Sequence, residues 1–171
     1  MAFTFENLNE NIRKKMLEEI QLDISSNQLY LSKRFNAKGN LNYQEILVKH
    51  VKTGNEISLG EELRQTDCFN TTEQTKTGSK KVPVNAHETL SESEFNRFYV
   101  RALCLIAIED QKKLQVYRAK SVQVSRSISQ QKIDSFVDPN QLLKDLRTNI
   151  GVDTALGLPS GPNSGLSVKL V

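Results

Sequence analysis

The chain has 171 residues, of which 23 are lysine or arginine and 20 are aspartate or glutamate, and it contains no tryptophan. This length fits one domain that buries its core without disulfides or a structural metal, and the two cysteines lack the CxxC spacing of a zinc knuckle. The net charge of +3 is too small to indicate nucleic-acid binding by itself, and neither a run of eighteen apolar residues nor a leader pattern predicts a membrane segment or secretion.

Three helices are predicted in the N-terminal part, residues 1–68. The first, from about 6 to 24, is indicated by apolar residues every four positions, at Leu8, Ile12, Met16 and Ile20. A second is predicted from about 42 to 52, and a short third one begins at Ser58 as its N-cap. Between the first two, the alternation of Leu29, Tyr30 and Leu31 is typical of a short strand or an extended turn.

Residues 69–84 are rich in threonine, lysine and glycine and contain little to bury. We expect a flexible loop there, within the same domain. The segment 85–156 that follows begins with a central helix, for which Ser91 and Glu94 form a predicted capping box and which ends near Glu109. Alternation from 114 to 124 predicts two strands or one interrupted strand, and a last helix has Asp138 as its N-cap and Gly151 as its C-cap.

The C-terminal segment, 157–171, is predicted to be an extended arm. Glycines and prolines mark a turn from Gly157 to Gly165, and Leu166, Val168 and Leu170 then alternate with polar residues as in a short strand. These three apolar side chains are the candidate docking residues, because such a strand can add to the sheet of a neighbouring subunit. The alternative is that it is an edge strand of its own domain. The expected fold is α+β, with about four helices packed on a small, mostly antiparallel sheet.

A basic segment without any acidic residue lies between Gln111 and Ile133. Its cations can contact a phosphate backbone or another anion, although runs of charge are more often a solvated face. The candidate residues for anion or nucleic-acid contact are Lys112, Lys113, Arg118, Lys120 and Arg126.

No catalytic signature is found. The two histidines, His50 and His87, lack the partners of a zinc site, and their expected roles are structural or at the surface. No phosphate-binding loop, dinucleotide fingerprint or nucleophile elbow occurs. We therefore expect a non-enzymatic protein with no metal and no cofactor.

The stretches "SESEFNRFYVRALCLIAIED", "LQVYRAK" and "DTALGLPSGPNSGLSVKL" resemble small uncharacterised proteins of bacterial and bacteriophage genomes. The resemblance covers the second half of the chain and implies a virion component of the head or head-to-tail region, located in the virion or in the cytoplasm of a bacterial host. With the residue patterns, it predicts a structural or assembly protein that forms homo- or hetero-oligomers through the 69–84 loop and the C-terminal arm. The alternative is a protein that binds or processes nucleic acid through residues 112–132.

Overall fold

The structure is a computed structural model that describes residues 2–151 and 164–171. This part of the chain forms helices and two small antiparallel sheets, so the predicted α+β class is confirmed. None of its helices is long and apolar enough to cross a membrane. The elements in order are α1 (Glu10–Ser25), α2 (Ala37–Thr53), α3 (Glu56–Gln65), β1 (Thr72–Thr75), β2 (Gly78–Lys81), α4 (Ala86–Glu109), β3 (Leu114–Arg118), α5 (Ser127–Lys132), β4 (Phe136–Val137), α6 (Pro139–Thr148) and β5 (Leu166–Leu170).

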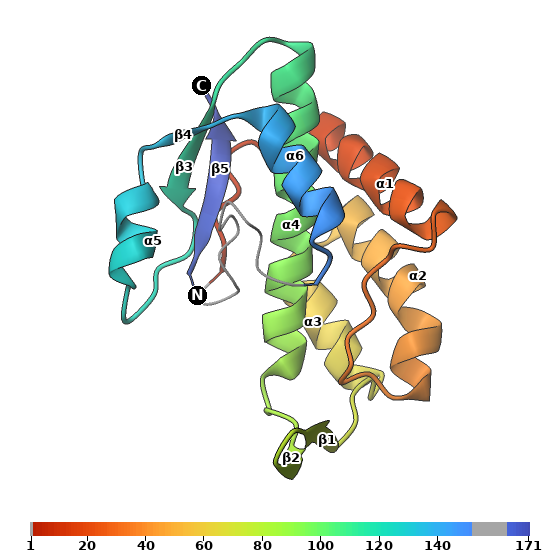
Figure 1. Ribbon diagram of the computed structural model, residues 1–171. Helices are drawn as coiled ribbons and strands as arrows, with labels where there is room; N and C mark the ends of the chain where they lie inside the picture. The colour runs from red at the N-terminus through yellow and green to blue at the C-terminus, as the bar shows by residue number, and fades with distance from the viewer. Residues whose placement is uncertain (1, 152–163) are drawn as a thin grey trace.

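Helix α4 runs through the centre of the molecule, with α1, α3 and α6 packed around it and the three-stranded sheet at its side (Figure 1). Phe95, Tyr99 and Leu103 are fully buried because neighbours cover the helix on several sides. The predicted start of this helix is wrong. It begins at Ala86, so Ser91 lies inside the helix, where it is buried and donates to the backbone oxygen of Glu88 instead of capping.

The three N-terminal helices begin at asparagine caps, at Asn9, Asn36 and Asn55, each of which accepts a hydrogen bond from a backbone N–H one turn ahead. The cap at Asn36 starts α2 five residues earlier than predicted. Gly39 fits there because a Cβ at this position would lie 2.3 Å from the carbonyl oxygen of Cys68. Of the two alternatives predicted around Tyr30, a short strand or an extended turn, the strand is absent, and these residues form a loop.

Strand β3 is the centre of the three-stranded sheet, whose order is β4-β3-β5 and whose pairs are all antiparallel. Val116 pairs with Val168 and Leu114 with Leu170, so both strands place apolar side chains toward the core. Residues 119–126 form no strand, and the short helix α5 that follows was not predicted. The C-terminal strand β5 pairs with β3 of the same chain, so it is an edge strand of its own domain and not an arm on a neighbouring subunit.

The outer edge of β5 is covered by two asparagine side chains. Asn96 on α4 donates to the carbonyl oxygen of Leu166 at 2.8 Å, and Asn7 accepts from the N–H of Leu170 at 3.0 Å. Asn96 also accepts from the hydroxyl of Ser167 at 2.7 Å. Because these groups occupy hydrogen-bonding positions along the edge, a strand from another chain cannot add there without displacing them.

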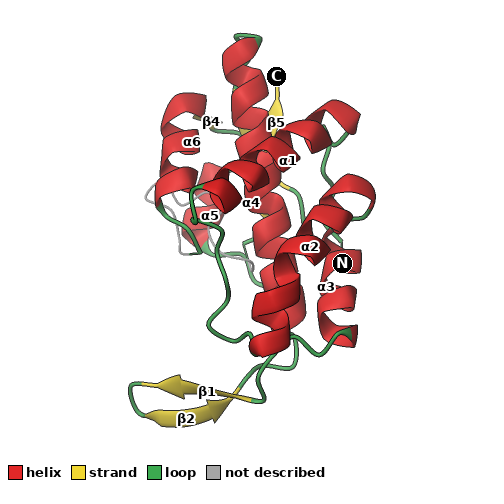
Figure 2. Cartoon of the chain, turned by 90° about the vertical axis from the view of Figure 1, so that its right-hand side faces the viewer, coloured by secondary structure: helices red, strands yellow, loops and turns green. Residues whose placement is uncertain are grey.

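The segment predicted as a loop contains a regular two-stranded hairpin, β1 and β2, which projects beyond the helices at one end of the molecule (Figures 1 and 2). The predicted loop therefore contains regular strands that were not predicted from the sequence. Helix α6 begins as predicted, with Asp138 accepting from the N–H of Gln141, but its C-cap is Asn149 and not Gly151. The turn predicted from Gly157 to Gly165 lies mostly outside the described residues.

Candidate nucleic-acid interface

The hairpin is anchored at its base by the loop between α1 and α2. Arg34 donates from Nε and Nη2 to the two carboxylate oxygens of Glu73, at 2.8 and 3.2 Å. Phe35 and Phe69 form an isolated β-bridge, and their ring centroids are 5.2 Å apart. An isolated hairpin is marginally stable in water, so these contacts explain why β1 and β2 have a defined position.

We use the name hairpin end for residues 32–38 and 67–82. The second range contains the hairpin, and the first is the part of the α1–α2 loop that packs against its base. The hairpin end contains six lysines or arginines and two aspartates or glutamates. The rest of the chain contains 17 lysines or arginines and 18 aspartates or glutamates. The hairpin end therefore holds all of the net positive charge of the protein. Its cations are Lys33, Arg34, Lys38, Lys76, Lys80 and Lys81.

Most of this charge is available to a ligand. Lys33, Lys76 and Lys81 are exposed and make no ion pair with any described residue. Lys80 lies 3.4 Å from Glu73, and Lys38 lies 3.8 Å from Asp67, and both lysine side chains are exposed. Ion pairs made by exposed lysines contribute little energy, so a polyanion can draw these two lysines away.

The composition of the hairpin distinguishes between classes of partner. Residues 72–81 include no aliphatic or aromatic side chain, only threonine, lysine, glutamate, glutamine, serine and glycine. Protein–protein interfaces are enriched in aromatic residues and methionine and depleted in lysine. Contacts to nucleic-acid phosphates come from lysine, arginine and small hydroxyl side chains. The hairpin matches the second pattern.

A cavity of about 330 Å³ lies beside the base of the hairpin. One wall is the α1–α2 loop with Tyr30, Lys33 and Arg34, and the hairpin contributes Glu73. The other wall is the first half of α4, which lines the cavity with a stripe of residues at helical spacing, namely Ala86, Thr89, Leu90, Ser93 and Glu94.

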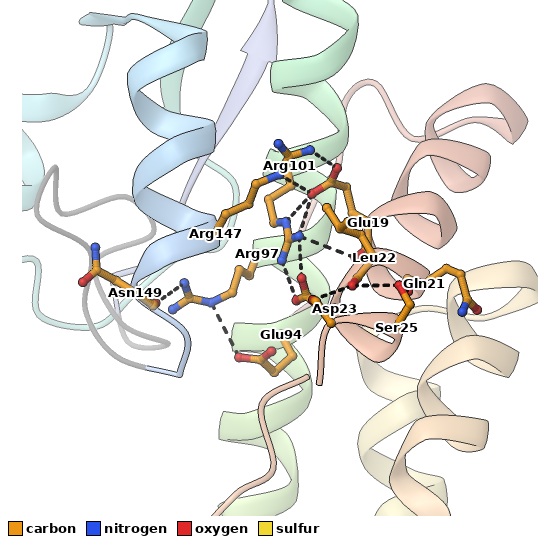
Figure 3. Close-up of polar contacts among 11 residues, drawn as sticks. Glu19, Gln21, Leu22, Asp23, Ser25, Glu94, Arg97, Arg101, Arg147 and Asn149 are labelled. Atoms are coloured by element: carbon orange, nitrogen blue, oxygen red, sulfur yellow. Dashed lines mark hydrogen bonds and ion pairs between the residues drawn. The ribbon is translucent and has the colours of Figure 1, made fainter. Parts of the chain in front are cut away.

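Glu94 is the buried ionisable group of this cavity. It is 2% exposed and accepts no hydrogen bond from any described residue, and Arg97 Nε lies 3.6 Å from its carboxylate (Figure 3). Burial raises the pKa of Glu94 to about 7, although Arg97 and Arg101 oppose the shift. The hydroxyl of Tyr43 is also buried without a hydrogen-bond partner among the described residues, and burial followed by the charge of Glu94 raises its pKa.

A second group of buried charges lies about two turns beyond Glu94 along α4, where α1, α4 and α6 meet (Figure 3). Arg101 donates to Glu19 at 2.7 Å and to both carboxylate oxygens of Asp23 at 2.7 and 2.8 Å. Arg147 on α6 donates to Glu19 at 3.0 and 2.5 Å. Burial raises the pKa of Glu19, but the two arginines more than offset this and hold it below its usual value. The partners of these charges lie within the protein, so we assign the group a structural role.

The basic segment predicted to contact anions is dispersed in the structure. Arg118 donates to the carbonyl oxygen of Ser164 at 2.7 Å, and Lys120 pairs with Glu92. Lys112 pairs with Asp110 at 3.3 Å, and Lys113 lies over the ring of Phe136 at 5.5 Å. Arg126 is exposed at the start of α5. Arg118 and Lys120 are thus held by partners in the chain, whereas Lys112, Lys113 and Arg126 are exposed, and Lys113 and Arg118 lie at opposite ends of β3, roughly 16 Å apart.

The candidate docking residues lie in the domain's own sheet. Leu166 and Val168 are fully buried in the main core, and Leu170 is partly buried against it. These side chains would have to leave the core before they could contact another subunit.

Neither histidine is at the surface. His87 is buried, with Nε2 3.7 Å from Glu88, and His50 lies between Ser58 Oγ at 2.8 Å and Glu62 at 2.6 Å. Within residues 2–151 and 164–171, no group of three or more histidines, cysteines or carboxylates could hold a metal ion.

Comparison of the chain with protein-family models, with curated proteins and with solved structures finds no match. The lysines at 76, 80 and 81 are the only sequence signal for the hairpin end. The loop that carries Lys33 is joined to the hairpin by the contact between Arg34 and Glu73, which are 39 positions apart in the sequence.

Proposed function

We propose that this protein is a non-enzymatic nucleic-acid-binding protein, and that its hairpin end is the binding element. The observation that carries the proposal is a projecting hairpin with exposed lysines and no apolar side chain, at the end of the molecule that holds all of its net positive charge. Lysines on such a projection can track a phosphate backbone and release its counterions. This differs from the alternative predicted from sequence, in which residues 112–132 make the contact.

The test compares two sets of three cations. One variant changes Lys76, Lys80 and Lys81 to serine, and a control of equal charge changes Lys112, Lys113 and Arg126 to serine. Affinity for a fluorescent single-stranded oligonucleotide is measured by anisotropy in low salt. We expect the hairpin variant to bind at least tenfold more weakly and the control to stay within threefold of the unmodified protein.

Two results would overturn the proposal. If the unmodified protein does not bind at low salt, the hairpin is not a nucleic-acid element. If only the variant at 112, 113 and 126 loses affinity, the contact belongs to the basic segment of residues 112–132.

A second candidate function, assembly on neighbouring subunits, has support from a different surface. Val124, Ile128 and Phe136 are 85%, 70% and 60% exposed on the segment that links β3 to α6. Contiguous exposed apolar patches are typical of docking surfaces, and these three exposed side chains belong to one segment of the chain.

For this second function we expect self-association that depends on the apolar segment. Sedimentation velocity over a hundredfold range of concentration is compared for the unmodified protein and for Ile128→Ser with Phe136→Ser. Association in the former and a monomer in the latter would support the assembly function. A monomer in both, over the whole range, would exclude self-assembly through this surface.

A further inference from the structure

The cavity at the base of the hairpin combines three features that suit one chemical class of ligand. Its volume of about 330 Å³ is at the small end of the range for small-molecule sites, which is roughly 300–1,000 Å³. An aromatic ring and a buried carboxyl lie on its walls, and an unpaired lysine lies at its rim. The proposed contact between the hairpin lysines and a phosphate backbone does not use this cavity.

Tyr30 offers a ring in a fixed position. Gly151 contacts this ring so closely that a Cβ at residue 151 would lie 2.2 Å from two of its carbons, and Gly151 has a φ of +67°, which favours glycine. The ring is partly exposed and lines the cavity. A planar group can stack on such a ring, as unpaired bases do on aromatic side chains.

Glu94 offers hydrogen bonds at the opposite wall. Its carboxyl has no hydrogen bond to the described residues, which leaves its oxygens able to pair with a ligand. Because its pKa of about 7 is near neutrality, the carboxyl can accept hydrogen bonds when ionised and donate one when protonated. Thr89 and Ser93, on the same face of α4, add two hydroxyls to this wall.

Lys33 supplies a positive charge at the rim. It is exposed, it lines the cavity, and it pairs with no described carboxylate. Its neighbour Arg34 is held by Glu73, which fixes the wall between the cavity and the hairpin. A phosphate beside Lys33 would therefore lie next to the surface on which the hairpin lysines act.

We infer that this cavity binds one nucleotide, with the base stacked on Tyr30, its hydrogen-bonding edge at Glu94, and the phosphate at Lys33. The inference rests on the proposed function for the source of the ligand, an unpaired nucleotide of the strand bound at the hairpin. It implies that the protein prefers single-stranded to fully paired nucleic acid, because a paired base cannot enter the cavity.

The test uses mononucleotides, which lack the extended phosphate backbone that the hairpin lysines would contact. The unmodified full chain is titrated calorimetrically with AMP, CMP, GMP and UMP, and with inorganic phosphate at equal ionic strength. We expect at least one mononucleotide to bind at least tenfold more tightly than phosphate. Glu94→Gln and Tyr30→Leu should each weaken that binding at least tenfold, and the hairpin variant at 76, 80 and 81 should change it less than twofold.

A measurement on the unmodified protein keeps the inference falsifiable if a variant does not fold. In ¹H–¹⁵N spectra, the mononucleotide should shift the amide signals of Thr89, Ser93 and Gly151. No binding of any mononucleotide at millimolar concentration, binding equal to that of phosphate, or shifts confined to other residues would overturn the inference.

Failure of the cavity and failure of the hairpin give different results. If oligonucleotides bind through the hairpin lysines but mononucleotides do not bind, the proposed function stands and the inference about the cavity is wrong. If mononucleotides bind at Glu94 but the hairpin variant keeps its affinity for oligonucleotides, the cavity stands and the hairpin proposal is wrong.

Discussion

The buried charges around Arg101 and the exposed charges of the hairpin end are built from the same residue types in opposite environments. Arg101 is 1% exposed, and its guanidinium is matched by the carboxylates of Glu19 and Asp23. Lys76 and Lys81 project into solvent and have no partner among the described residues. Charges that are paired and desolvated hold helices together, whereas unpaired charges on a projection remain available to a ligand.

The largest effect is expected where a buried charge loses its partner. Arg101→Met leaves Asp23 and part of Glu19 buried without a counter-charge, which typically costs about 3–5 kcal/mol in the free energy of unfolding. Urea denaturation measures it. Lys14→Met, an exposed site on α1, is the control and should change stability by less than about 0.5 kcal/mol. Equal stability of the two variants would show that the buried charges do not hold the helices together.

The next effect depends on pH and concerns Glu94. Its pKa rises from 4.5 to about 7 on folding, so the folded protein binds the proton more tightly than the unfolded chain. Stability is then highest below the unfolded pKa and declines as pH rises through about 7, by about 3 kcal/mol in total. Glu94→Gln should remove this contribution, which is measured by comparing unfolding of the two proteins at pH 5 and pH 8. An identical pH dependence in both would contradict the assignment.

A smaller loss is expected at the edge of the sheet. Asn96→Ala leaves the carbonyl oxygen of Leu166 and the hydroxyl of Ser167 without this partner in a buried site. The expected cost is about 1–3 kcal/mol. Thermal or chemical unfolding checks it, and hydrogen exchange at β5 should accelerate with it. Unchanged exchange at β5 would mean that Asn96 does not protect this edge.

The smallest effect on stability is expected at the hairpin. The change of Lys76, Lys80 and Lys81 to serine removes exposed charges that make little contact with the core, and unfolding should shift by less than about 0.5 kcal/mol. A loss near that of Arg101→Met would show that these lysines support the fold, which would contradict the contrast between the two regions.

Elements whose signals are local could be predicted from the sequence. The cap of Asp138 on α6 and the alternation in Leu166, Val168 and Leu170 were sufficient for a helix start and a strand. The start of α4 differs from the predicted one because Ser91 and Glu94 have the spacing of a capping box, whereas both side chains are buried inside the helix by tertiary packing. Gly60 on α3 approaches Ser91 so closely that a Cβ would lie 2.7 Å from its hydroxyl.

The hairpin and the cavity could not be predicted in the same way. Strand prediction depends on alternating apolar residues, and residues 72–81 contain none, so the ordering comes from distant contacts such as Arg34 with Glu73. The cavity brings Tyr30, Glu73, Glu94 and Gly151 together, and no local pattern indicates that these positions meet.

The most direct test of the hairpin as a nucleic-acid element is the dependence of binding on salt. For a single strand, the slope of log affinity against log salt is about 0.7 per phosphate neutralised. If Lys76, Lys80 and Lys81 contact phosphates, their change to serine should reduce this slope by about 2, and the control at Lys112, Lys113 and Arg126 should leave it unchanged. An unchanged slope in the hairpin variant would contradict the proposed function.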